Sequence, residues 1–173
     1  MLTSENYINR EGETVDTPGI KLSFANHVNG VTWDQPEPGY LTVVTRCYKG
    51  KEALGINQRS LSNQSDSDWD QVCIHDEVGI GLHKANGLFH QHRHLVKGTY
   101  VLLLDDDDKL TDDDFVKKLK DRDEDIVWFG GDCLVVKNQV FQDNIEEDDG
   151  GCQFLKEILK KKHKYTKYHI EGK

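Results

Sequence analysis

A chain of 173 residues has the size of one domain, and we expect a single globular unit rather than two. Its 31 acidic residues outnumber 22 basic ones and give a formal net charge of -9, which disfavours binding to the phosphate backbone of nucleic acids. No apolar run approaches the length of a membrane span, and the first residues lack the pattern of a signal peptide, so we expect a cytoplasmic protein.

Residues 1–38 differ from the rest of the chain and are expected to form an N-terminal arm or a short hairpin ahead of the domain of residues 39–173. This segment has few clustered apolar residues and holds all three prolines of the chain. It ends in the stretch QPEPG at 35–39, which is rich in turn-forming residues. The regular alternation of strands and helices is therefore expected from residue 40 onward.

The next part of the chain predicts two strands, each followed by a helix. Residues 41–45 form a short β-branched run typical of a buried strand, and residues 51–63 have helical spacing of apolar side chains. A second strand is expected at 71–74 and a second helix at 84–96. Strands that alternate with helices in this way favour an α/β fold with a parallel sheet.

The strongest strand of the chain is expected at residues 99–104, where a continuous apolar run fits a sheet that is covered on both faces. Further elements are expected as a helix at 112–120, strands at 125–129 and 133–136, and a last helix at 151–162. The sequence therefore predicts a mostly parallel central sheet flanked by helices, with ligands bound outside the carboxyl ends of its strands.

Polar residues follow each of the expected strands and should converge on one crevice. They are Thr45, Arg46, Asp76, Glu77, Asp105, Asp106, Asp107, Asp108 and residues 130–132. In an extended segment Asp105 and Asp107 leave on the same side and can share a cation, while Asp106 points elsewhere. Two carboxylates together with phosphate oxygens suit Mg²⁺ or Mn²⁺, which would neutralise a diphosphate leaving group. A solvated acidic surface is the alternative, but four charges against an apolar strand end are costly without a cation or abundant water.

Four motifs occur in a characteristic order along the chain. They are LTVVT at 41–45, SLSNQ at 60–64, DWDQVCIHD at 68–76 and GTYVLLLDDDD at 98–108. In this order they resemble the inverting GT-A fold glycosyltransferases of the large family 2 type, over about residues 41–159. The resemblance implies a single-domain Rossmann-like GT-A fold and transfer of a hexose from a nucleoside-diphosphate sugar, expected to be a UDP-sugar, to a glycan or other hydroxyl acceptor with inversion.

The resemblance also implies roles for particular residues. The residues expected to bind the metal are Asp107 and Asp105. Those expected to bind the donor are Thr45, Arg46, Tyr48, Asp76, Asp105 and Asp106. The family's catalytic base belongs to an acidic pair that opens a late helix, and the matching segment is EDD at 147–149. Asp149 is the expected base, with Asp148 as the neighbouring candidate, and it would take the proton of the acceptor hydroxyl.

Two other functions stay open at this point. A nucleotidyltransferase of related topology would need a glycine-rich phosphate loop after the first strand, and residues 46–50 supply one glycine. A non-catalytic module that binds a nucleotide-sugar or a metal would need the same acidic cluster without turnover. The four cysteines, Cys47, Cys73, Cys133 and Cys152, have no metal-binding spacing and are expected to be reduced thiols.

Overall fold

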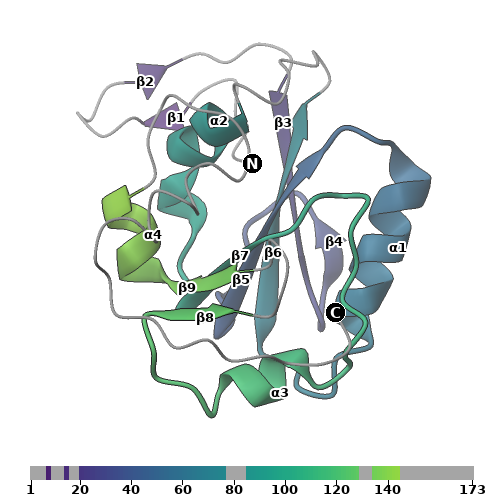
Figure 1. Cartoon of the computed structure of the whole chain (residues 1–173). Helices are drawn as coiled ribbons and strands as arrows, with labels where there is room; N and C mark the ends of the chain where they lie inside the picture. Colours follow the sequence, from purple (N-terminus) through teal and green to yellow (C-terminus); the bar gives the residue numbers. More distant parts are fainter. Residues whose placement is uncertain (1–6, 9–13, 16–19, 77–84, 129–133, 145–173) are drawn as a thin grey trace.

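The computed structural model describes residues 7–8, 14–15, 20–76, 85–128 and 134–144, and the structural statements below concern these residues. Figure 1 labels their helices and strands. The strands are β1 (Tyr7–Ile8), β2 (Thr14–Val15), β3 (Ile20–Asn26), β4 (Gly30–Thr32), β5 (Leu41–Cys47), β6 (Trp69–Asp76), β7 (Tyr100–Leu103), β8 (Ile126–Trp128) and β9 (Leu134–Lys137). The helices are α1 (Lys51–Ser62), α2 (Ala85–Gln91), α3 (Phe115–Leu119), α4 (Asn138–Asn144) and the 3-10 helix η2 (Arg93–Leu95).

Seven of the described strands form one mixed sheet, in the order β4-β3-β6-β5-β7-β9-β8. The central strand β5 runs parallel to both of its neighbours, β6 and β7. The other four pairings, β3 with β4, β3 with β6, β7 with β9 and β8 with β9, are antiparallel. The parallel part of the sheet is therefore limited to its three central strands.

The predicted mostly parallel, helix-flanked Rossmann-like GT-A domain is wrong. The sheet is mixed, and the described helices are few and short, the longest being α1 with 12 residues. The five residues 129–133 join β8 to β9, and a connection of that length is too short for the crossover that parallel strands require. On the other side of the sheet, β3 pairs antiparallel with β6 over its own whole length, from Ile20 opposite Asp76 to Asn26 opposite Asp70.

Part of the N-terminal segment belongs to this main sheet. Ile20, Leu22 and Phe24 alternate with polar or small residues and lie buried on one face of β3. β3 and β4 form a hairpin whose turn ends at Gly30, which has a φ of 62° that favours glycine. The backbone N–H of Asn29 donates to Asn26 Oδ1 at 2.7 Å within this turn. Residues 20–32 therefore form a hairpin that extends the sheet beyond β6.

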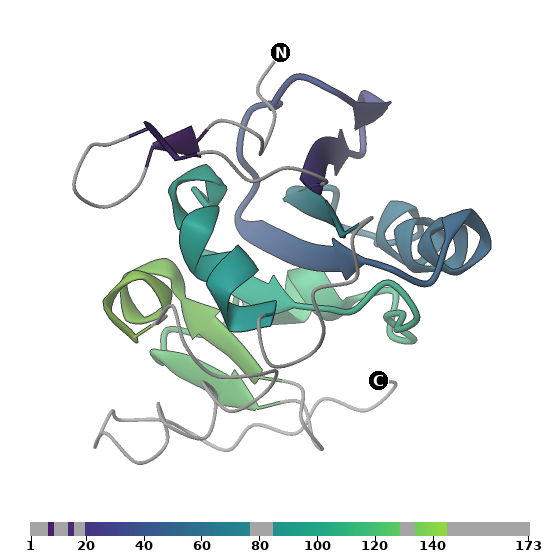
Figure 2. The ribbon, with the colours of Figure 1, turned by 90° about the horizontal axis from the view of Figure 1, so that it is seen from above.

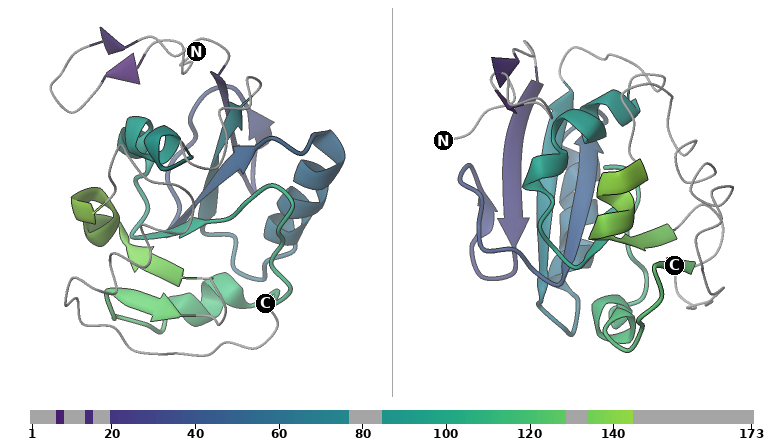
Figure 3. Two further views of the ribbon diagram at one scale, coloured as in Figure 1. Left: turned by 45° about the horizontal axis from the view of Figure 1, so that its top comes forward. Right: turned by 90° about the vertical axis from the view of Figure 1, so that its left-hand side faces the viewer.

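Hydrophobic side chains pack on both faces of the sheet. On one face, Val44 of β5 belongs to a cluster with residues of α2 and α4. On the opposite face, Val43 belongs to a cluster with residues of α1 and α3. Figures 2 and 3 show α1 and α2 on either side of the central strands. All seven residues of β5 are buried, as expected for a strand that is covered on both sides.

The central elements lie where the sequence predicted them. The strands expected at 41–45, 71–74 and 99–104 are confirmed as β5, β6 and β7, and the helix expected at 51–63 is confirmed as α1. The expected helix at 84–96 is divided between α2 and η2, and the sequence did not predict α4. The expected helix at 151–162 lies outside the described residues.

Candidate functional site

The carboxyl ends of the three parallel strands meet at one edge of the sheet. The chain leaves β5 through α1 and returns as β6 on one side of β5, whereas β7 lies on the other side and leads on to β8 and β9. Ligands of open sheets bind outside the carboxyl ends of strands, where successive connections run in opposite directions. The residues that follow β5, β6 and β7 therefore form the candidate site.

A turn of four aspartates follows β7, and we call residues 105–108 the acidic turn. The N–H of Asp108 donates to the carbonyl oxygen of Asp105 at 3.0 Å, which closes the turn. One carboxylate oxygen from each of Asp105, Asp107 and Asp108 lies within 4.8 Å of the other two. All three side chains are exposed, and within the described part of the chain none of them forms an ion pair. Their oxygens suit a divalent cation such as Mn²⁺ or Mg²⁺.

The pKa of Asp105 is raised by its surroundings in the acidic turn. Although this residue is exposed by its overall surface, crowding by its neighbours desolvates the carboxyl group and raises its pKa. The negative charges of Asp108 and Asp107 raise the pKa further, while Arg46 lowers it. Binding of a cation would remove this repulsion.

The predicted metal pair, Asp105 and Asp107, is brought together in the structure, and Asp108 joins it as a third carboxylate. The strand alternation used to pair the first two does not apply, because β7 ends at Leu103 and the aspartates lie in a turn. Asp108 was missed because side-chain directions in a turn follow its hydrogen bonds rather than a period of two.

Asp106 differs from its three neighbours because it is fully buried. Its Oδ2 accepts hydrogen bonds from the backbone N–H groups of Tyr48 at 2.8 Å and Lys49 at 2.7 Å. Among the described residues its Oδ1 has no hydrogen-bond partner. The sequence predicted that Asp106 points away from Asp105 and Asp107, and the resemblance gave it a donor contact. In the structure its carboxylate instead fastens the acidic turn to the loop after β5.

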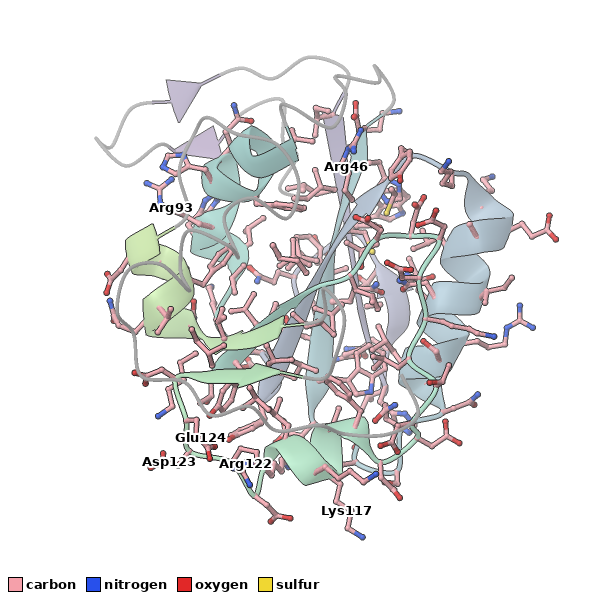
Figure 4. The ribbon with its side chains drawn as sticks, viewed as in Figure 1. Arg46, Arg93, Lys117, Arg122, Asp123 and Glu124 are labelled. Atoms are coloured by element: carbon pink, nitrogen blue, oxygen red, sulfur yellow. The ribbon has the colours of Figure 1, made fainter. Side chains whose placement is uncertain are left out.

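Arg46 and Asp76 form a buried ion pair at the ends of β5 and β6. The guanidinium Nη2 donates to Asp76 Oδ2 at 3.1 Å, and the exposed fractions of the two side chains are 7% and 0%. The guanidinium carbon also lies 4.4 Å from the centre of the Tyr48 ring, a favourable cation–π distance. Figure 4 shows Arg46 at the edge of the sheet where β5 and β6 end. Arg46 therefore contacts both of the other predicted donor residues, Asp76 and Tyr48.

The Tyr48 side chain is 40% exposed and lies close to the negative charges. Burial of part of the ring raises the pKa of its hydroxyl, and the carboxylates of Asp105, Asp107 and Asp106 raise it further. The hydroxyl therefore stays protonated at neutral pH and can donate a hydrogen bond.

Thr45, another predicted donor residue, lies in the protein interior rather than at the surface of the site. Its Oγ1 accepts a hydrogen bond from Gln71 Nε2 at 2.8 Å. Gln71 Nε2 also donates to Asn57 Oδ1 at 2.9 Å, and all three residues are fully buried. Sequence reasoning missed Asn57 and Gln71. The signal that could have found Gln71 is an amide directly before the apolar run at 72–74, because a buried amide needs a polar partner.

Cys47 and Cys73 lie on neighbouring strands, face α1 and are both buried free thiols. The hydrogen bond between them and their burial raise the pKa of Cys47 far above its usual range. A thiol that stays protonated is a poor nucleophile. The expectation of reduced core thiols is confirmed for these two cysteines, while Cys133 and Cys152 lie outside the described residues.

The predicted catalytic bases, Asp149 and Asp148, also lie outside the described residues, as does Glu77. No protein-family model matches the chain, and no curated protein matches it. The resemblance to family 2 glycosyltransferases therefore stays a prediction from the sequence motifs. Within the described ranges, none of the helices has the length and apolar character needed to cross a bilayer.

Proposed function

We propose that this protein is a metal-dependent glycosyltransferase. In this proposal it binds Mn²⁺ or Mg²⁺ together with a nucleoside-diphosphate sugar, with a UDP-sugar as the first candidate, and transfers the sugar to a hydroxyl acceptor with inversion. One observation carries the proposal: three exposed carboxylates without an ion-pair partner among the described residues gather where parallel strands end. The ordered motifs of the sequence supply the choice of reaction.

In this proposal Asp105, Asp107 and Asp108 hold the cation, whose chemistry is to neutralise the charge of the departing diphosphate. The Tyr48 ring, supported by the Arg46 guanidinium, offers a flat partly exposed surface beside the acidic turn for the nucleoside. Thr45 and Asp106 are buried, so they support the site without contacting the donor.

The acceptor hydroxyl would lose its proton to Asp149 or Asp148, in a single displacement at the anomeric carbon. Acceptors in this proposal are glycans or other hydroxyl compounds. A cytoplasmic location is also part of the proposal, because Cys47 and Cys73 are buried free thiols of the kind that persist in a reducing compartment.

A screen of UDP-, GDP- and dTDP-sugars, each with and without Mn²⁺, tests the proposal. We expect a rise in the melting temperature when donor and Mn²⁺ are present together, and release of nucleoside diphosphate that EDTA abolishes. Substitution Asp107→Ala should abolish both, whereas Asp123→Ala, at an acid that pairs with Lys137, should change neither. Activity that persists in EDTA would contradict the proposal, and donor binding without turnover would favour a non-catalytic module.

A further inference from the structure

A chain of side-chain amides from Gln58, Gln71 and Asn57 joins α1 to the central sheet. Gln58 Nε2 donates to Gln71 Oε1 at 3.2 Å, and Gln71 Nε2 donates to Asn57 Oδ1 at 2.9 Å. The chain ends on the acidic turn, because Asn57 Nδ2 donates to the carbonyl oxygen of Asp105 at 3.0 Å. Asn57 and Gln71 are fully buried, so water does not compete for the hydrogen bond between these two amides.

The carbonyl oxygen of Asp105 has two donors. It accepts from Asn57 Nδ2 and, at 3.0 Å, from the N–H of Asp108, the bond that closes the turn. Asn57 therefore acts on the one backbone group that sets the spacing between the first and last carboxylates of the cluster. Among the described residues, Asn57 is the side chain that donates to that carbonyl oxygen.

The acidic turn needs such a support because its carboxylates repel one another. Asp105, Asp107 and Asp108 have no cationic side chain within ion-pair distance among the described residues, so nothing in their own side chains holds them together. Two contacts hold the turn instead: Asn57 of α1 donates to its backbone, and its own buried Asp106 accepts from the backbone of the loop after β5. Asn57 is the support that carries no charge and contacts no carboxylate.

We propose that Asn57 is a positioning residue for a divalent-cation site at Asp105, Asp107 and Asp108. It fixes the backbone of the turn so that three carboxylates face a common point before the cation arrives. This inference rests on the proposed function, because it takes the cation site as given and adds the residue that shapes it. Supports behind metal ligands hold their orientation, and their loss weakens metal binding without removing a ligand.

Gln64, which lies just after the end of the same helix, provides a matched control. It is also buried, its Nε2 donates to the carbonyl oxygen of Asp112 at 2.8 Å, and its Oε1 accepts from the N–H of Val116 at 3.1 Å. This amide thus performs the same kind of bridging toward the α3 segment, away from the acidic turn. A purely structural role for Asn57 would make the two substitutions equivalent.

The experiment compares Mn²⁺ affinity and melting temperature in the full chain, by calorimetric titration and thermal unfolding. Asn57→Ala should weaken Mn²⁺ binding about tenfold, the lower end of what the loss of an outer support costs. Gln64→Ala should lower the melting temperature to a similar degree and leave Mn²⁺ affinity unchanged. If Asn57→Ala does not fold, Gln71→Leu takes its place, because it keeps most of the buried volume and removes the amide that orients Asn57.

The outcomes separate this inference from the proposed function. Absence of Mn²⁺ binding in the unsubstituted protein would overturn the proposed function and the inference with it. Normal Mn²⁺ binding that stays unchanged in Asn57→Ala, or that falls equally in Gln64→Ala, would overturn the inference alone. A selective loss of affinity in Asn57→Ala, or in Gln71→Leu where that variant is used, supports it.

Discussion

Within the described ranges, acidic residues form ion pairs near α3, at one end of the central strands, but not in the acidic turn at the other end. Near α3, acids are paired with bases: Lys118 with Asp112 at 2.6 Å, Lys120 with Asp66 at 2.9 Å and Asp68 at 3.0 Å, Arg122 with Glu124, and Lys137 with Asp123 at 3.2 Å. At the other end the acidic turn has no such pairs among the described residues. Figure 4 shows Arg122, Asp123 and Glu124 beside α3, far from Arg46.

This contrast separates two uses of acidic residues in a chain with a net charge of -9. Exposed ion pairs contribute little to stability, but they remove the local excess of charge. The acidic turn keeps that excess, in a fixed geometry and at the edge of the sheet where ligands bind. Acids paired with bases near α3, and three carboxylates of the acidic turn without such pairs in the described part of the chain, are the physical basis for proposing a cation site.

The largest effect that would test this contrast is on Mn²⁺ binding. Asp107→Asn removes one charge and one ligand oxygen from the cluster, and we expect a loss of affinity of about a hundredfold or more, beyond the usual cost of losing an outer support. The matched change Asp123→Asn, at the opposite end, should leave the affinity unchanged. Calorimetric titration with Mn²⁺ measures both affinities. Equal losses in the two variants would contradict a cation site at the acidic turn.

The next effect concerns the buried carboxylate behind the turn. Asp106→Ala removes the acceptor of two backbone N–H groups, those of Tyr48 and Lys49. Because bonds to a charged group contribute about 1.5–3 kcal/mol each, we expect the free energy of unfolding to fall by about 3 kcal/mol. Urea denaturation measures the change. An unchanged midpoint would show that the two loops do not depend on this carboxylate.

A smaller, pH-dependent effect is expected at Asp70, which lies fully buried at the amino end of β6. Burial raises its pKa from 3.8 to about 6, partly offset by hydrogen bonds from Thr42 and Gly39. The folded state therefore binds a proton more tightly than the unfolded state. Its contribution to stability is complete below about pH 4 and is lost as the pH rises toward 6.

The variant Asp70→Asn lacks this titratable group, so it isolates the contribution of Asp70 to the pH dependence of stability. Relative to the unsubstituted protein, its free energy of unfolding should improve by about 2 kcal/mol between pH 4 and pH 7, within the limit set by a shift of that size. Urea denaturation across this range gives the difference at each pH. A difference that does not change with pH would mean that Asp70 titrates alike in the folded and unfolded chains.

Much of the centre of the molecule could be predicted from the sequence. β5 begins with a β-branched run, β7 is a continuous apolar run, and β6 contains a short apolar run at 72–74; such runs are the strongest local signals of a buried strand. The acidic turn was equally visible, since four charges directly after an apolar run are rare without a reason. These segments could be predicted from the local sequence alone, without knowing which distant residues they contact.

The sheet's outer strands were harder to predict, for two physical reasons. Ile20, Leu22 and Phe24 alternate clearly with polar or small residues, but the prolines and glycines around them obscured the strand. It is stabilised by pairing with β6, a strand distant in the sequence. The directions of β8 and β9 depend on the length of their connection, a constraint that apolar periodicity does not reveal.

Within the site, the sequence indicated which residues gather but not what each one contacts. Arg46, Asp76 and Tyr48 were expected near the acidic turn, and in the structure Arg46 contacts both of the others. The burial of Asp106 and the bond from Asn57 depend on how one turn sits against a helix and a loop. Contacts of that kind are tertiary, so the local pattern of residues cannot specify them.

The attachment of Asp106 to the loop after β5 has a consequence for ligand binding. Because one carboxylate oxygen holds the N–H groups of both Tyr48 and Lys49, the acidic turn and the aromatic ring are tied to the same anchor. A molecule that reached from the carboxylates to the ring would meet two preorganised surfaces at a set spacing. It would lose little entropy in ordering them, so its affinity would depend on its own length.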